Sequence, residues 1–178
     1  MRRRALLLAP PLLTVGACGF RPLYGEAPQG AAASTASGDL AATRVALIAD
    51  REGQLLRQAL VQNLGSDRGA PALYELLVRV QVRREQLAVQ QDQTETRNRV
   101  SAVAEFVLRP LTPPGDPVTR GRALAVDAFN VGTDQYFAAQ LSGEAAVRRL
   151  TERLAQDITG QLAAFYARRR ATTAARGT

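Results

Sequence analysis

The chain has 178 residues, 46% of them hydrophobic and 5% aromatic, and its formal net charge is +7 from 23 basic and 16 acidic residues. Histidine is absent, which removes the commonest general base and metal ligand and so excludes a Ser-His-Asp triad and a typical zinc site. The single cysteine cannot form an internal disulfide, and neither a P-loop nor a Gly-rich nucleotide motif is present. We therefore expect a protein that is not an enzyme and uses no cofactor or metal.

The N-terminus has the three parts of a secretory signal: arginines at 2–4, a short apolar run at 5–13, and small residues before Cys18. The apolar run is far shorter than the roughly 20 residues that span a bilayer. Val15-Gly16-Ala17-Cys18 resembles the bacterial lipobox, in which the cysteine is lipidated before cleavage. An ordinary signal with an incidental cysteine is the alternative. We expect residues 1–17 to be a cleaved signal peptide and Cys18 to carry lipid.

Residues 26–42 are rich in Ala, Gly and Ser, which predicts a flexible tether, so residues 18–42 are expected to form the lipid anchor and this tether. Removal of the signal leaves 161 residues, enough for one modest domain. The first element of that domain is a short apolar strand at 43–49. Asp50 is placed to cap a helix over 51–64, and Gly65 to end it. Leucines at helical spacing give this helix one apolar face.

Three alternating segments follow. Apolar residues at every second position from Tyr74 to Val82 predict a strand with one buried and one wet face. The same pattern runs from Val100 to Leu108, and a third alternating run covers residues 119–129. The polar segment 84–96 between the first two is either a hairpin tip or a continuation of the strands. The Pro-rich segment 110–117 is a turn.

Ser142 is placed to cap a long helix after a loop at 130–141. Its apolar residues step by three or four: Val147, Leu150, Leu154, Ile158, Leu162 and Phe165. Residues 169–178, basic and small, predict a disordered tail. The element order β-α-β-β-β-α predicts an α+β fold, a two-layer sandwich in which two helices pack on one face of a four-stranded mixed sheet. The sandwich domain is expected to span residues 43–168.

All basic residues are arginine, which forms bidentate pairs with phosphate, although a GC-rich genome is an ordinary cause of this bias. Without the three arginines of the signal, the mature chain carries 20 basic and 16 acidic residues, a net charge of about +4. A basic surface suits nucleic acid or anionic lipid. Export and lipidation favour lipid, and we expect no nucleic-acid partner.

The segment CGFRPLYG, Cys18 to Gly25, closely resembles the mature N-terminus of the LptE family of lipopolysaccharide-assembly lipoproteins, in its alphaproteobacterial form. The element order and the segments Phe129 to Tyr136 and LAQDITGQLAAFY extend the resemblance over the mature chain. The resemblance implies a lipid-anchored protein on the periplasmic side of the outer membrane. It also implies a protein that plugs and helps assemble the LptD β-barrel and binds lipopolysaccharide during export. Gly19 after the cysteine agrees with outer-membrane sorting.

The alternating strands place arginines near the far end of the expected hairpin. We expect Arg83, Arg84, Arg97 and Arg99 to form a cluster that binds lipid A phosphates, because close like charges repel unless an anion joins them. A solvated sheet face with no ligand is the other interpretation. An auxiliary lipoprotein of another envelope lipid transport system remains the alternative function, and a carboxylate-based enzyme domain is a third.

Overall fold

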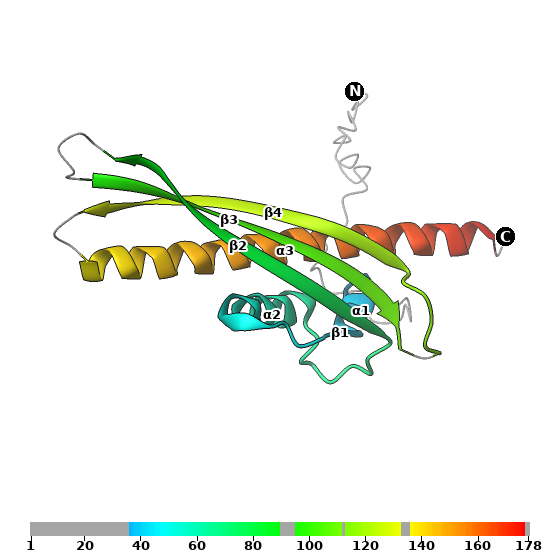
Figure 1. The fold of residues 1–178 in the computed structure, drawn as a ribbon. Coiled ribbons are helices and arrows are strands. Elements are labelled where there is room, and N and C mark those ends of the chain that lie inside the picture. The colour runs from blue at the N-terminus through cyan, green and yellow to red at the C-terminus, as the bar shows by residue number, and fades with distance from the viewer. Residues whose placement is uncertain (1–35, 90–94, 112, 133–135, 177–178) are drawn as a thin grey trace, which may run out of the picture. The chain divides into compact units, whose positions relative to one another are not determined.

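The computed structural model describes residues 36–89, 95–111, 113–132 and 136–176. The chain order is α-β-α-β-β-β-α (Figure 1). The elements are α1 (Ala36–Ala41), β1 (Thr43–Val45), α2 (Asp50–Leu64), β2 (Tyr74–Val89), β3 (Glu95–Pro110), β4 (Thr119–Gly132) and α3 (Tyr136–Arg176). The predicted cleavage site and lipidated Cys18 lie outside the described residues.

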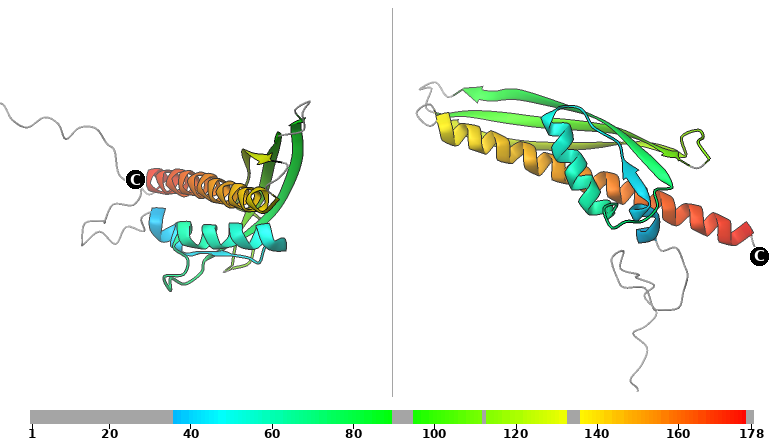
Figure 2. Two further views of the ribbon diagram at one scale, coloured as in Figure 1. Left: turned by 90° about the vertical axis from the view of Figure 1, so that its left-hand side faces the viewer. Right: turned by 90° about the horizontal axis from the view of Figure 1, so that it is seen from below.

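The four strands form one mixed sheet in the order β1-β2-β3-β4. β1 is parallel to β2, whereas β2, β3 and β4 pair antiparallel. The described part of the polar segment 84–96 continues the two strands, because the pairing of β2 with β3 extends to Val89 opposite Thr96. The register of this pairing shifts between Gln86 and Ala88. Figure 2 shows α2 and α3 on the same face of this sheet. The predicted α+β two-layer sandwich is therefore confirmed.

The core lies between the sheet and the helices. The strand residues that line it are those that the predicted alternation turns inward. Inward residues of β3 are buried: Val100, Ala102, Ala104, Phe106 and Leu108. β4 approaches this layer closely, since a Cβ on Gly121 would lie 2.4 Å from Cζ of Phe106. Only glycine leaves room for that ring. The other face of the sheet carries exposed arginines and glutamates on β2 and β3, and the exposed apolar side chains of Leu124 and Val126 on β4.

The start of the first long helix differs from the prediction. The N-cap residue of α2 is Ala49, which makes no side-chain capping hydrogen bond. Asp50 is the first residue of the helix rather than its cap, although its φ is +67°. The preceding strand ends at Val45 rather than Ala49, and Leu47 is 89% exposed. The predicted stop is confirmed: Gly65 has left-handed geometry, with φ at +68°, and its amide donates to Val61 and Gln62.

The last helix starts earlier than predicted. α3 begins at Tyr136, so Ser142 lies inside the helix and caps nothing. No Pro or Gly interrupts residues 136–142, and the helix therefore extends upstream of the local cap signal. The predicted stripe is buried from Val147 to Leu162, but Phe165 is only partly buried and Tyr166 takes the last core position.

Two predicted unstructured segments are wrong in part. The last residues of the expected tether fold as α1, and Leu40 is 2% exposed against the core. The expected tail continues α3 through Arg176. Both segments are ordered by one set of contacts between the start and the end of the domain, which neither segment reveals alone.

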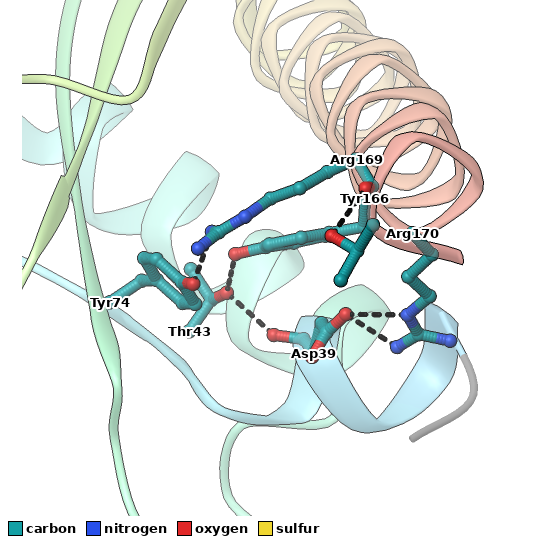
Figure 3. A network of polar contacts seen from close by, with 7 residues as sticks. Asp39, Thr43, Tyr74, Tyr166, Arg169 and Arg170 are labelled. Carbon is teal, nitrogen blue, oxygen red and sulfur yellow. Dashed lines mark hydrogen bonds and ion pairs between the residues drawn. The ribbon is translucent and has the colours of Figure 1, made fainter. Parts of the chain in front are cut away.

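These contacts form a network that we call the polar clamp, made of Asp39, Thr43, Tyr74, Tyr166, Arg169 and Arg170 (Figure 3). The Thr43 hydroxyl donates to the Asp39 carbonyl at 2.9 Å, and it lies 2.8 Å from the Tyr166 hydroxyl. Because the Thr43 proton is used, Tyr166 donates to Thr43. Arg170 pairs with the Asp39 carboxylate. Arg169 donates to the Tyr74 hydroxyl and lies over its ring, 5.6 Å from the centroid.

Among the described residues, no helix combines the length and apolar character that crossing a membrane would need.

Candidate functional site

A groove of about 500 Å³ lies at the end of the sandwich opposite the polar clamp. Its walls come from the start of α2, the first third of α3 and the inward faces of β2, β3 and β4. We call it the hairpin-end groove. Its volume is within the roughly 300–1,000 Å³ of ordinary ligand sites. Its lining residues are Arg51, Glu52, Leu55, Arg84, Asn98, Phe129, Val131, Tyr136, Ala139, Gln140, Gly143, Glu144, Val147 and Arg148.

The groove combines apolar and charged surfaces. Leu55, Phe129, Val131 and Val147 supply the apolar part. Their positions follow from the strand and helix periodicities, which turn Phe129 and Val131 of β4 toward the helices. Close by, α3 exposes apolar side chains to solvent: Tyr136 is 83% and Phe137 73% exposed. Such a surface suits a molecule with both acyl chains and a polar head.

The charged rim is partly paired. Arg84 of β2 lies 3.0 Å from the Glu52 carboxylate of α2, and Arg51 lies 3.5 Å from Glu144 of α3. A hydrogen bond from its own backbone amide and the Arg84 guanidinium hold the pKa of Glu52 below its usual range, so this carboxylate is charged at neutral pH. Arg148 forms no ion pair with any described residue, and its exposed guanidinium is available to an anion.

One polar atom of the groove has no partner. The side-chain oxygen of Asn98 is buried and accepts no hydrogen bond within the described part of the chain. A buried acceptor left without a donor costs about 1–3 kcal/mol. A ligand hydroxyl or amide that entered the groove could satisfy it. The groove can therefore bind an amphipathic anion through apolar contacts, Arg148 and Asn98.

The four arginines predicted as one cluster are divided between the two faces of the sheet. Arg83, Arg97 and Arg99 lie on the outer face, whereas Arg84 points into the groove. Successive residues of a strand point to opposite faces, so Arg83 and Arg84 cannot share a site on one face. Arg99 also has Glu85 as its direct cross-strand neighbour. Whether any of the four contacts lipid stays a prediction.

The groove residues other than Arg84 were not predicted. The groove brings together residues from Arg51 to Arg148, and no local pattern marks such a set. The adjacent aromatic residues Tyr136 and Phe137 were the one available signal, and the segment containing them was expected to be a loop. Among the described residues, no group of acidic, cysteine or histidine side chains could hold a metal ion.

The same fold occurs in solved bacterial proteins. A protein of Caulobacter crescentus CB15 assigned as a lipoprotein superposes with a TM-score of 0.61 at 23% identity, covering 74% of this chain and 96% of that one. Rare lipoprotein B from Shewanella oneidensis gives a TM-score of 0.53 at 13% identity, covering 72% of this chain and 98% of that one. At such identities the similarity establishes a shared fold.

Comparisons of the sequence itself add no family. No family model matches the chain. No curated protein matches it either.

Proposed function

We propose that this protein is an outer-membrane lipoprotein, anchored through Cys18, that binds lipopolysaccharide during its export and assists an LptD-type β-barrel. The lipobox-like Val15-Gly16-Ala17-Cys18 and the segment that follows it support the anchor and the family. The shared fold with bacterial lipoproteins is compatible with both. No enzymatic activity, cofactor or nucleic-acid partner forms part of this proposal.

The observation that carries lipid binding is the hairpin-end groove. Lipid A joins acyl chains to phosphates, and the groove joins an apolar wall to Arg148, which has no described ion-pair partner. A charge-assisted contact of this kind contributes about 1.5–3 kcal/mol. Burial of part of an acyl chain adds about 0.8 kcal/mol for each methylene group.

The position of the groove supports a role across the membrane. Phe137 and Arg170 are separated by 33 residues of α3, which corresponds to about 50 Å of helix. The hydrocarbon core of a bilayer is about 30 Å thick. A domain enclosed by a barrel, with the polar clamp at its periplasmic end, could therefore present the groove beyond the inner leaflet.

Titration of the purified protein with lipopolysaccharide tests the lipid part of the proposal. Arg148→Gln should weaken binding about tenfold, equivalent to about 1.4 kcal/mol. Arg84→Gln should weaken it too, while Arg83→Gln, its neighbour on the opposite face, should bind like wild type. Binding should also weaken with rising salt, because exposed charges are screened. Equal losses for Arg83→Gln and Arg84→Gln would contradict the assignment of the groove.

Affinity purification from the native membrane tests the partner. An export factor of the proposed kind should co-purify with a heat-resistant outer-membrane barrel, identified by mass spectrometry. Recovery of inner-membrane transporter components instead would favour an auxiliary lipoprotein of another lipid transport system.

A further inference from the structure

The two edges of the sheet differ in whether their outward backbone groups are hydrogen-bonded. On β4, side chains form hydrogen bonds with backbone groups that point away from β3. Gln161 donates to the Arg122 carbonyl at 2.9 Å, Arg153 donates to the Val126 carbonyl at 3.1 Å, and the amide of Ala128 donates to Asp127 at 2.9 Å. Gln161 and Arg153 come from α3, which packs along β4 (Figure 2). This edge is closed to another strand at these points.

The opposite edge of the sheet is open. β1 pairs only with Tyr74 to Leu76, and the last hydrogen bond joins the Ala46 amide to the Leu76 carbonyl at 3.0 Å. Backbone groups of alternate residues face the same side of a strand, so those of Val78, Val80, Val82 and Arg84 also point away from β3. No described residue hydrogen-bonds to them. We call residues 78–86 the free edge of β2.

An unpaired edge of this length is a template for another strand. Proteins commonly block such an edge with proline, and β2 contains none. Pairing with a second copy of this chain is disfavoured by the helix layer. Glu52 holds the start of α2 beneath Arg84, so a second copy would bring its own α2 into the layer that α2 already fills. A single extended segment avoids this overlap.

The side chains along the free edge define what that segment should contain. Val78, Val80 and Val82 are partly buried and pack against the core from the helix side. On the other face, Arg79 and Arg83 are exposed, and neither has an ion-pair partner within the described part of the chain. A strand with apolar residues next to the valines and carboxylates next to the arginines would complement both faces.

We propose that the free edge of β2 binds an extended segment of a partner protein by β-strand addition, the segment alternating apolar and acidic residues. Backbone hydrogen bonds supply affinity in this mode, and alternate side chains supply specificity. The proposal does not depend on lipid binding in the groove, because the interacting groups belong to a sheet edge and to Arg79 and Arg83.

A labelled heptapeptide of three valines alternating with two glutamates, flanked by threonines, serves as the probe. Fluorescence anisotropy with the full-length protein in detergent should show saturable binding. Val82→Pro removes one outward amide and should weaken binding at least about tenfold. Leu124→Pro makes the same change on the outward side of β4 and should leave binding unchanged. Circular dichroism checks that both variants fold.

Peptide variants keep the test independent of the protein's folding. The same peptide with N-methylated amides on its pairing side should not bind, and a version with lysine in place of glutamate should bind several-fold more weakly. Binding that survives Val82→Pro, or equal binding of the glutamate and lysine peptides, would overturn the proposal. Sedimentation that shows a dimer abolished by Val82→Pro would assign the edge to a second copy and would overturn it as well.

Discussion

At the scale of single residues, Tyr166 joins the beginning of the domain to its last helix. Its ring is buried against Tyr74 and Phe165, with centroids 5.6 Å and 5.4 Å away, while its hydroxyl donates to Thr43. Burial raises the pKa of Tyr166, so the hydroxyl keeps its proton at any physiological pH. The hydrogen bond to Thr43 therefore does not depend on pH in the physiological range.

Tyr166→Phe should lower the free energy of unfolding by about 1 kcal/mol, because it removes one buried hydrogen bond and keeps the ring. Thr43 retains its bond to the Asp39 carbonyl, which limits the loss. Urea unfolding measures the effect. Tyr136→Phe is the matched control, since that side chain is 83% exposed and should be neutral. Equal midpoints for the two variants would show that the clamp does not stabilise the domain.

Asp127 gives the stability a dependence on acid pH. Burial alone would raise the pKa of Asp127, but hydrogen bonds from Arg149 and the Ala128 amide outweigh it and lower the pKa below the ordinary 3.8. The folded state then binds the proton less readily than the unfolded state. The stabilisation is complete above about pH 5 and is lost as pH falls through the lowered value.

The stability difference between wild type and Asp127→Asn should accordingly be largest near neutral pH and shrink as pH falls below 3.8. Asparagine keeps an oxygen for the Ala128 amide, so the comparison isolates the charge. Urea titrations at several pH values provide the measurement. A difference that does not change with pH would argue against the ion pair with Arg149.

At the scale of elements, α3 dominates the structure. Its 41 residues correspond to about 60 Å of helix and contribute in turn to the groove, the core and the polar clamp. Its middle section is the most buried, and Leu154, Ala155 and Ile158 are each fully inaccessible. The sheet cannot bury its inward face without this section.

Leu154→Asp should destabilise the domain by about 3 kcal/mol or more, because it places an unpaired carboxylate in the core. Thermal melts followed by circular dichroism give the comparison. Gln156→Asp adds the same charge at an exposed position of the helix and should change the melting temperature little. Coincident melts of wild type and Leu154→Asp would mean that α3 is not docked on the sheet.

The sequence allowed the regular parts of these elements to be predicted, because alternation and helical spacing are local. Alternation predicted the inward face of β3, and helical spacing predicted the apolar stripe from Val147 to Leu162. Boundaries were less predictable, since Ser142 carries a local cap signal that the upstream residues override. The order in the segment containing Arg169 and Arg170 depends on partners about 95 and 131 residues away. The groove depends on distant residues in the same way.

At the scale of the whole molecule, the proposed lipid anchor at Cys18 would determine where these surfaces operate. Cys18→Ser should abolish palmitate labelling and leave an uncleaved precursor, because lipid attachment precedes cleavage at a lipobox. One acyl chain binds a membrane only reversibly, so a stable anchor should carry more than one. Labelling in cells followed by gel electrophoresis measures both effects. Normal labelling of the variant would refute lipidation at this residue.

The polar clamp also has a consequence for biogenesis. Thr43 and Tyr166 are 123 residues apart in the chain, and α3 covers the sheet only after all four strands have been made. A chain that crosses a membrane from its N-terminus therefore cannot close its core until the last helix has emerged. Folding that depends on such distant contacts is slow. Under the proposed export, the core would therefore stay open, and the chain competent for translocation, until α3 has been released and the native domain can form.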